Sequence, residues 1–384
     1  MILKKDSNET IYLKENVYEA SLNRIRALFD EFENVVVGFS GGKDSTICFN
    51  LTLQVAREKN RLPLKVLFLD QEAEWQNTID YVKKVMYHKD VEPLWFQMPV
   101  KLFNATSHQE HWLECWKDGE DWIREKEDIA IKENKYNSDR FADLFTKIFA
   151  VDFYDKKSCY ISGVRCEESP VRKMALTQGI TYKWITWGKV LTSKLDHYTF
   201  YPIYDWSYLD VWKAIHDNNW SYNKIYDYYY RYGVPIQQMR VSNVHHETAI
   251  KSLEFMQEIE KDTWEKITKR VQGANTIKHL KQNSYTVKKL PFMFTDWVEY
   301  RDYLLENLIS GEVKDKFKKE FDYMDSAFSN TDVYEKGLKT CVTALLKNDY
   351  HMTVINNFKR RPENFKFNKR KKYDLKGTNI SRVQ

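Results

Sequence analysis

The chain carries, at positions 35–45, the stretch Val35-Val36-Val37-Gly38-Phe39-Ser40-Gly41-Gly42-Lys43-Asp44-Ser45. Its first five residues have the length and side chains of a buried strand, and residues 46–53 carry apolar side chains at helical spacing. The two adjacent glycines let main-chain N–H groups approach a ligand, and the start of a helix adds unpaired N–H donors and partial positive charge. The stretch therefore predicts a strand–turn–helix that cradles phosphate groups.

The side chains of this turn suit the same purpose. Lys43 supplies a mobile positive charge, and Ser40 and Ser45 supply hydroxyl groups. The alternative is an ordinary strand–turn–helix junction with a capping side chain. The spacing differs from the phosphate loop of motor and switch NTPases, which has four residues between Gly and Gly-Lys, because only three separate Gly38 from Gly42.

The run Ser-Gly-Gly-Lys-Asp-Ser resembles the PP-loop of the adenine nucleotide alpha-hydrolase superfamily. That superfamily includes ATP pyrophosphatases, the small subunit of ATP sulfurylase and the phosphoadenosine phosphosulfate (PAPS) reductases. The resemblance implies that the turn binds the β- and γ-phosphates of ATP, or the corresponding groups of PAPS. The implied nucleotide-binding residues are Ser40, Gly41, Gly42, Lys43, Asp44 and Ser45.

A second strand is expected at residues 64–70, after the helix that follows the turn. Strand, helix and strand in such a short span form a βαβ unit, which favours a parallel sheet covered on both faces. The predicted fold class is therefore α/β with a doubly wound, mainly parallel, Rossmann-like sheet. The resemblance implies the HUP-type PP-loop version of this fold.

Acidic residues follow the second strand in the run Asp70-Gln71-Glu72-Ala73-Glu74. Open α/β sheets bind ligands at the carboxyl ends of their strands, and carboxylates beside a triphosphate can hold Mg²⁺. Asp70, at the strand tip, is the predicted nucleotide and magnesium residue. For Glu72 and Glu74, a role as acids that complement a helix dipole stays open. The superfamily resemblance places adenosine recognition at this edge, largely through backbone atoms.

A second candidate site lies at residues 158–172, where an apolar strand ends at Gly163 and Ser169-Pro170 begins a helix. Arg165 and Arg172 flank the turn, and guanidinium groups suit phosphate or sulfate. The alternative is a pair of surface arginines that bind Glu167 and Glu168. The pattern Gly-x-Arg-x-x-Glu-Ser with a later Arg resembles the second motif of PAPS reductases, which implies that Gly163, Arg165 and Arg172 face the same nucleotide as the turn.

The resemblance runs from about residue 30 to 245 and includes Pro202-Ile203-Tyr204-Asp205-Trp206-Ser207 and the tyrosine-rich residues 222–235. Within the superfamily the chain is most similar to IbrA-type putative co-activators of prophage gene expression. That similarity implies a ParB/sulfiredoxin-like partner. One departure is that no cysteine follows Cys341. PAPS reductases carry a nucleophilic cysteine in a C-terminal tail, so reduction of PAPS is not expected.

Other possible metal ligands are His108, His111 and Cys115, which fall within two turns of a helix if residues 108–115 are helical. Zinc at these residues and ordinary packing both stay open. The five cysteines are scattered and include no Cys-x-x-Cys pair, so a disulfide framework is not expected.

Composition predicts a soluble globular protein, with 42% hydrophobic and 30% charged residues and no run of transmembrane length. We therefore expect a cytoplasmic protein with no membrane association. The formal charge of +5 is uneven, since residues 356–384 hold ten Lys and Arg against two acids. This basic tail contains interleaved aromatics, which suits nucleic acid, although a solvated tail explains the charges equally well.

The predicted organisation is an N-terminal helix at 1–33, a nucleotide-binding domain at 34–245, a helical C-terminal domain at 246–355 and the tail at 356–384. The first functional reading is an enzyme that cleaves ATP, with Mg²⁺, between the α- and β-phosphates and adenylylates an unknown acceptor. Lys43, Asp70, Arg165 and Arg172 are its predicted catalytic residues. The second reading is a non-catalytic nucleotide sensor acting with a ParB-like partner on nucleic acid, and a PAPS-binding variant of the fold also stays open.

Overall fold

The computed structural model describes residues 14–192, 195–236, 239–241, 244, 253–274 and 289–362. The chain forms two compact units. Unit 1 comprises Met1–Asn104 and Trp112–Ile277, and unit 2 comprises Ala105–His111 and Lys278–Gln384. The predicted domain boundary at residue 245 and most of the predicted basic tail lie outside the described residues, so those limits stay predictions.

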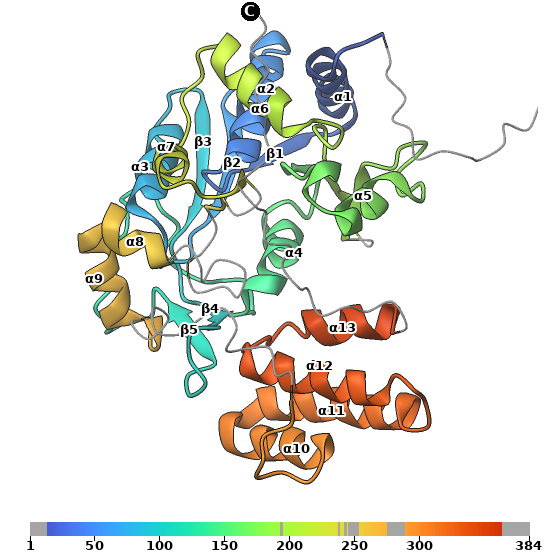
Figure 1. Cartoon of the computed structure of the whole chain (residues 1–384). Coiled ribbons are helices and arrows are strands. Elements are labelled where there is room, and N and C mark those ends of the chain that lie inside the picture. Colours follow the sequence, from blue (N-terminus) through green and yellow to red (C-terminus); the bar gives the residue numbers. More distant parts are fainter. Residues whose placement is uncertain are drawn as a thin grey trace, which may run out of the picture. The chain divides into compact units, whose positions relative to one another are not determined.

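Unit 1 is built on a six-stranded sheet (Figure 1). In spatial order its strands are β3 (Val91–Phe96), β2 (Leu64–Leu69), β1 (Asn34–Gly38), β6 (Ser158–Ile161), β8 (His197–Phe200) and β7 (Gly188–Thr192). Every neighbouring pair is parallel except β7 and β8. A separate antiparallel pair is formed by β4 (Val100–Phe103) and β5 (Trp112–Cys115). The predicted mainly parallel α/β fold is confirmed.

Helices cover both faces of this sheet. The described helices of unit 1 are α1 (Val17–Glu31), α2 (Lys43–Glu58), α3 (Gln76–Met86), α4 (Phe141–Asp152), α5 (Pro170–Thr177), α6 (Tyr208–Asp217), α7 (Ile225–Arg231), α8 (Leu253–Ile259) and α9 (Lys261–Arg270), with a short 3₁₀ turn at Cys166–Glu168. Side chains alternate along β1, so Val35 and Val37 pack with α1, α2 and α6, whereas Val36 packs on the opposite face with α4. In Figure 1, α4 accordingly lies across the sheet from α2 and α6.

The order of the strands reverses at β1. From β1 the chain proceeds to β2 and β3 on one side, and it returns on the other side of β1 with β6. In the register of this pair, Val36 lies beside Tyr160 and Val37 beside Ile161. Ligands of open α/β sheets bind outside the carboxyl ends of the strands at such a reversal. The two sequence motifs follow these two strands, so the fold brings them to the same edge.

Unit 2 is helical, as expected for the C-terminal region. Its helices are α10 (Trp297–Leu308), α11 (Gly311–Phe328), α12 (Tyr334–Leu346) and α13 (Thr353–Arg360). The segment 105–111 belongs to this unit, because Asn348 Nδ2 donates to the carbonyl oxygen of Ala105 at 3.1 Å and Tyr350 Oη donates to that of Ser107 at 2.7 Å.

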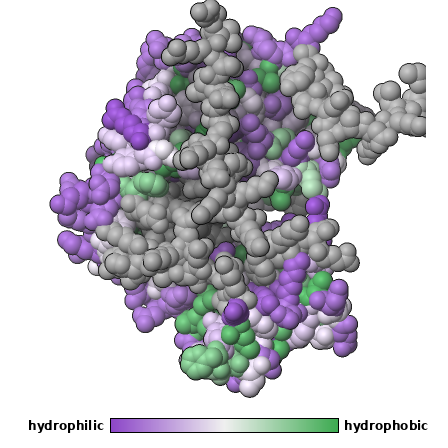
Figure 2. All heavy atoms as spheres, viewed as in Figure 1, coloured by the Kyte–Doolittle hydropathy of each residue, from purple (hydrophilic) through white to green (hydrophobic). Residues whose placement is uncertain are grey.

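Figure 2 shows apolar residues gathered over the end of unit 2 that carries α10, and Phe292 and Met293, which precede this helix, are exposed. Among the described helices, we find none that combines the length and apolar character needed to cross a membrane.

Candidate functional site

The turn between β1 and α2 is closed by its own side chains. Gly41 has a φ of +70°, a left-handed conformation that favours glycine, and α2 starts at Lys43 with Gly42 as its N-cap. Ser45 Oγ donates to the carbonyl oxygen of Gly42 at 2.9 Å and lies 3.2 Å from Ser40 Oγ. The predicted strand–turn–helix is therefore present, and the two hydroxyl groups of its turn are adjacent.

Tyr226 of α7 and Asn223, which precedes that helix, form hydrogen bonds to the backbone of this turn. The Lys43 backbone N–H donates to Tyr226 Oη at 3.0 Å, and Asn223 Nδ2 donates to the carbonyl oxygen of Gly41 at 3.1 Å. Burial raises the pKa of Tyr226. The sequence analysis gave Tyr226 and Asn223 no role, and the only signal was their place in the tyrosine-rich stretch that carries the family resemblance.

The loop after β6, which carries the second motif, contacts the first turn of α2. A Cβ added at Gly163 would come within 2.7 Å of the Asp44 carbonyl carbon and 2.9 Å of the Ser45 backbone nitrogen. Such contacts are too short for any side chain, so only glycine lets the loop after β6 approach the first turn of α2 this closely. The structure thus brings together the two stretches that the sequence analysis expected to face one nucleotide.

These segments enclose a cavity of about 340 Å³ in unit 1. The size is at the lower end of the range for small-molecule sites. Its polar lining includes Ser40, Lys43, Asp44, Ser45, Gln71, Glu74, Ser162, Glu168, Arg172 and Arg240. Its apolar lining includes Phe141, Phe145, Tyr160, Met239 and Val241. The cavity therefore combines a cationic, hydroxyl-rich part with aromatic and aliphatic walls.

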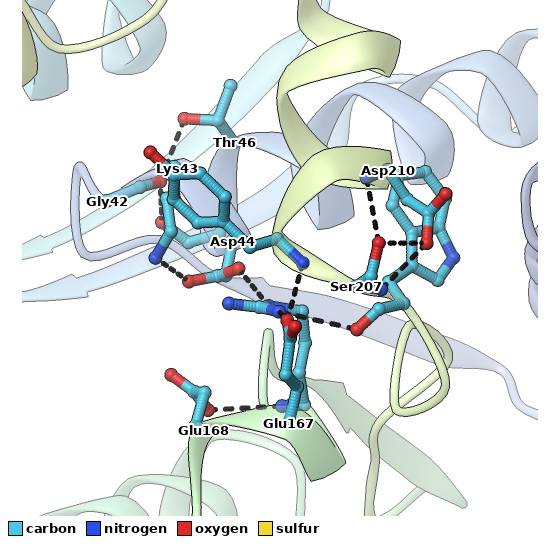
Figure 3. A network of polar contacts seen from close by, with 12 residues as sticks. Gly42, Lys43, Asp44, Thr46, Glu167, Glu168, Ser207 and Asp210 are labelled. Atoms are coloured by element: carbon cyan, nitrogen blue, oxygen red, sulfur yellow. Dashed lines mark hydrogen bonds and ion pairs between the residues drawn. The ribbon is translucent and has the colours of Figure 1, made fainter. Parts of the chain in front are cut away.

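Asp44 is the centre of the polar network beside the cavity (Figure 3). Its Oδ2 accepts from Lys43 Nζ at 2.7 Å, and its Oδ1 accepts from Arg165 Nε at 2.6 Å. The Arg165 side chain is 4% exposed and also donates to Glu167 Oε2 at 2.8 Å. Burial by itself would lower the pKa of Arg165, but the charge and hydrogen bond of Asp44, together with Glu167 and Glu168, outweigh it and the pKa is raised. Arg165 faces this network and is not among the residues that line the cavity.

Arg172 and Arg240 are the arginines that line the cavity. Arg172 pairs with Glu168 and Arg165 pairs with Glu167, as the alternative reading of the motif expected, although Arg165 is buried and not on the surface. Arg240 is exposed, and its backbone oxygen accepts from Tyr229 Oη at 2.8 Å. Arg240 lies within the stretch that carries the family resemblance, but no local pattern predicts that it lies near a loop some 200 positions earlier.

The predicted magnesium residue occupies a different environment. Asp70 is fully buried, pairs with Arg124, and accepts from Trp95 Nε1 and Gln97 Nε2, both at 2.9 Å. Glu72 is likewise buried and pairs with Arg270 at 2.9 Å. Neither acid lines the cavity, whereas Glu74 does.

The possible zinc ligands do not share a helix. Trp112–Cys115 form strand β5, so the helical spacing assumed for His108, His111 and Cys115 is wrong. Cys115 Sγ donates to the carbonyl oxygen of Gln71 at 3.0 Å. Within the described residues, no group of three or more His, Cys, Asp or Glu side chains is arranged to hold a metal ion.

Comparison with known proteins shows two matching families and two uncharacterised relatives. Residues 34–233 match the phosphoadenosine phosphosulfate reductase domain, and residues 233–376 match a domain of unknown function, DUF3440. The uncharacterized protein YbdN of Escherichia coli K12 is 29% identical over 277 residues, which cover 69% of this chain and 68% of that protein. The uncharacterized protein MJ0973 of Methanocaldococcus jannaschii is 27% identical over 221 residues, which cover 56% of this chain and 44% of the relative.

Solved structures give weaker similarities, with TM-scores too low to support an argument about function. FMN adenylyltransferase of Candida glabrata with FAD and inorganic pyrophosphate has a TM-score of 0.36 at 12% identity, covering 57% of this chain and 64% of that one. PAPS reductase of Candida auris with phosphate has a TM-score of 0.33 at 14% identity, covering 61% and 90%. The family match, by contrast, spans more than half of the sequence, so the chain belongs to the phosphoadenosine phosphosulfate reductase domain family.

Proposed function

We propose that this protein binds ATP and cleaves it between the α- and β-phosphates, transferring the adenylyl group to an acceptor and releasing pyrophosphate. The observation that supports this proposal is the contact of Gly163 with the first turn of α2, beside a single cavity. A turn rich in N–H groups, a lysine and an arginine around one space suit a polyphosphate.

The proposed chemistry depends on position and charge. Lys43 and the hydroxyl groups of Ser40 and Ser45 stabilise the leaving pyrophosphate, and Arg172 stabilises the transferred group or the acceptor. For this, the phosphates compete with Asp44 for Lys43 and with Glu168 for Arg172. We propose that Arg165 acts through Asp44 as a positioning residue, because its guanidinium is held by Asp44 and Glu167.

In this proposal, Mg²⁺ binds together with the nucleotide. Mg²⁺ usually keeps several waters and binds to substrate phosphates plus one or two carboxylates. Asp44 is the acid of the phosphate turn and lines the cavity, so it fits that role. Assignment of Mg²⁺ to Asp70 stays a prediction, and it requires the carboxylate to be released by Arg124.

Binding of PAPS is the variant of this proposal that keeps the same site. Reduction of PAPS is not proposed, because it needs a reactive thiolate and four of the five cysteines are buried. The fifth, Cys166, has a pKa raised first by burial and then by the charge of Asp205.

The test is incubation with ATP labelled at the α-phosphate, in the presence of Mg²⁺, followed by separation of AMP and adenylylated products. Lys43→Ala is expected to abolish product formation, whereas Lys84→Ala, an exposed lysine on α3, is the matched control. Binding of ATP without any AMP or adenylylated product, with and without candidate acceptors, would contradict the enzymatic proposal and favour a nucleotide sensor.

We further propose a relationship to the IbrA-type proteins and, with it, a ParB/sulfiredoxin-like partner and a cytoplasmic location, where ATP is available. Co-purification with the product of an adjacent ParB-like gene tests the partner.

Nucleic acid binding by the basic tail is tested by comparing the full chain with one that ends at residue 362. Loss of binding in the shorter chain is the expected result.

A further inference from the structure

Two buried oxygen atoms of residues that line the cavity have no hydrogen-bond partner among the described residues. They are Gln71 Oε1 and Glu74 Oε2, on the segment that follows β2. Glu74 is 4% exposed. A buried acceptor without a donor is costly and uncommon in native structures, so two such residues in the lining of one cavity point to a ligand that supplies the donors.

The neighbouring acids do not share this property. Asp70 accepts hydrogen bonds from Trp95 and Gln97 and pairs with Arg124. Glu72 accepts from the Trp116 backbone N–H at 2.7 Å and pairs with Arg270. Because these two carboxylates are paired within the fold, the unpartnered oxygens of Gln71 and Glu74 are not a general feature of this acidic segment.

The walls of the cavity indicate what kind of group carries the donors. Leu67, Phe68 and Leu69 at the end of β2 line it together with Phe141 and Phe145 of α4. Flat apolar and aromatic walls suit the faces of a nucleobase, whereas the lysine and serines of the turn suit its phosphates. Two acceptors without donors match an exocyclic amino group, which has two N–H bonds.

We propose that Gln71 and Glu74 accept hydrogen bonds from the exocyclic 6-amino group of adenine and thereby select adenine nucleotides. This inference rests on the proposed function, because it takes the bound molecule to be a nucleotide. It adds side-chain recognition of the base to the backbone contacts implied by the superfamily resemblance. A 6-oxo purine has no N–H bonds on its 6-substituent and places an acceptor against the amide oxygen of Gln71, so it is disfavoured.

A cation is the other ligand that oxygens of this kind accept, and the surroundings favour the amine. Burial, and then the nearby charge of Asp70, raise the pKa of Glu74 well above its usual range, which favours the neutral acid. A neutral acid still offers an acceptor oxygen to an N–H group. Mg²⁺ instead needs ionised carboxylates and retains much of its water, which an apolar, buried position does not favour.

The experiment measures binding of ATP, ITP, purine riboside triphosphate and inorganic tripolyphosphate by calorimetry at one Mg²⁺ concentration. ITP carries oxygen at position 6 and purine riboside triphosphate carries hydrogen there. The wild-type chain is expected to bind ATP about 10- to 100-fold more tightly than either analogue. Glu74→Leu and Gln71→Leu are expected to weaken ATP binding towards that of purine riboside triphosphate and to leave the analogues unchanged.

Two controls separate recognition from folding. Glu74→Gln keeps an acceptor oxygen and is expected to restore the preference for ATP, and Glu133→Gln, at an exposed position, is expected to change nothing. Equal binding of ATP and ITP by the wild-type chain, or equal weakening of all nucleotides by the Leu variants, overturns the inference. The inference is also overturned if Glu74→Leu keeps the preference for ATP over ITP but needs a higher Mg²⁺ concentration for binding, which assigns Glu74 to the metal.

The same measurements distinguish failure of this inference from failure of the proposed function. If tripolyphosphate and ATP bind equally and Lys43→Ala abolishes both, the phosphate site stands and the adenine site does not. If neither tripolyphosphate nor any nucleotide binds to the wild-type chain, both proposals are wrong.

Discussion

Asp44 Oδ1 accepts a hydrogen bond from Arg165 Nε at 2.6 Å, which joins the turn after β1 to the loop after β6. The side chains are 13% and 4% exposed, respectively, so the pair is largely screened from water. The second carboxylate oxygen of Asp44 accepts from Lys43 Nζ, the cation that we propose binds a phosphate. A ligand that binds Lys43 therefore removes one partner of the Asp44 carboxylate, and the same carboxylate pairs with Arg165 of the second motif.

The Asp44–Arg165 pair is expected to stabilise the folded protein. Asp44→Asn leaves Arg165 paired with Glu167, and loss of one member of a buried pair costs about 3 kcal/mol. A double-mutant cycle with Arg165→Met, followed by urea unfolding, is expected to give a coupling energy of about 1–3 kcal/mol. The exposed Lys213–Asp217 pair is the control, and its coupling energy is expected to be much smaller. Equal coupling in both pairs would contradict this role.

Gly163→Ala is expected to separate the two motifs. The added Cβ meets Asp44 backbone at 2.7 Å, and backbone cannot move aside as a flexible side chain can. We expect a loss of about 1–3 kcal/mol in the free energy of unfolding and at least a tenfold weaker binding of ATP. Gly119→Ala is the control, since that position has a positive φ but no heavy atom within 4 Å of the added Cβ. It should lower stability and leave ATP binding intact. If Gly119→Ala weakens ATP binding and Gly163→Ala does not, the close approach at Gly163 is not needed for binding.

Asp70→Asn tests the assignment of this residue to magnesium. Asp70 is fully buried and pairs with Arg124, so loss of its charge is expected to reduce the free energy of unfolding by about 3 kcal/mol. A magnesium ligand would, in addition, raise the Mg²⁺ concentration needed for ATP binding. Calorimetry across a Mg²⁺ series measures this second effect, and an unchanged requirement removes Asp70 from the metal site.

Glu31 is expected to make stability depend on pH. Hydrogen bonds from Lys157, Lys183 and Tyr182 lower the pKa of Glu31 from 4.5 to about 2. Because the folded-state pKa is the lower one, the stabilisation is complete above about pH 4.5 and is lost as the pH falls towards 2. Glu31→Gln should therefore cost about 1–2 kcal/mol at pH 7, after allowance for partial exposure, and progressively less in acid.

Urea unfolding at pH 7 and at pH 3 measures this difference. Glu133→Gln, at an exposed position, is the control and should cost little at either pH. A cost for Glu31→Gln that stays constant with pH would show that its charge is not the source of the stabilisation.

The sequence by itself determined the elements that depend on near neighbours. Glycine at position 41 suits the left-handed turn, and the β-branched run ending at Gly38 forms β1. The strand expected at residues 64–70 is β2, and the parallel pairing of the two follows from the helix between them. These features could be predicted because backbone conformation and hydrophobic spacing are properties of short stretches.

Only the tertiary structure decided which charges meet. Asp70 and Glu72 look alike in the sequence, but Arg124 and Arg270 pair with them from distant positions, while Glu74 is left with an unpartnered oxygen beside the cavity. The sequence likewise does not show that Arg165 faces Asp44, since 120 residues separate the two motifs and strand order places them side by side. Long-range pairing follows from sheet topology and packing, which no local pattern specifies.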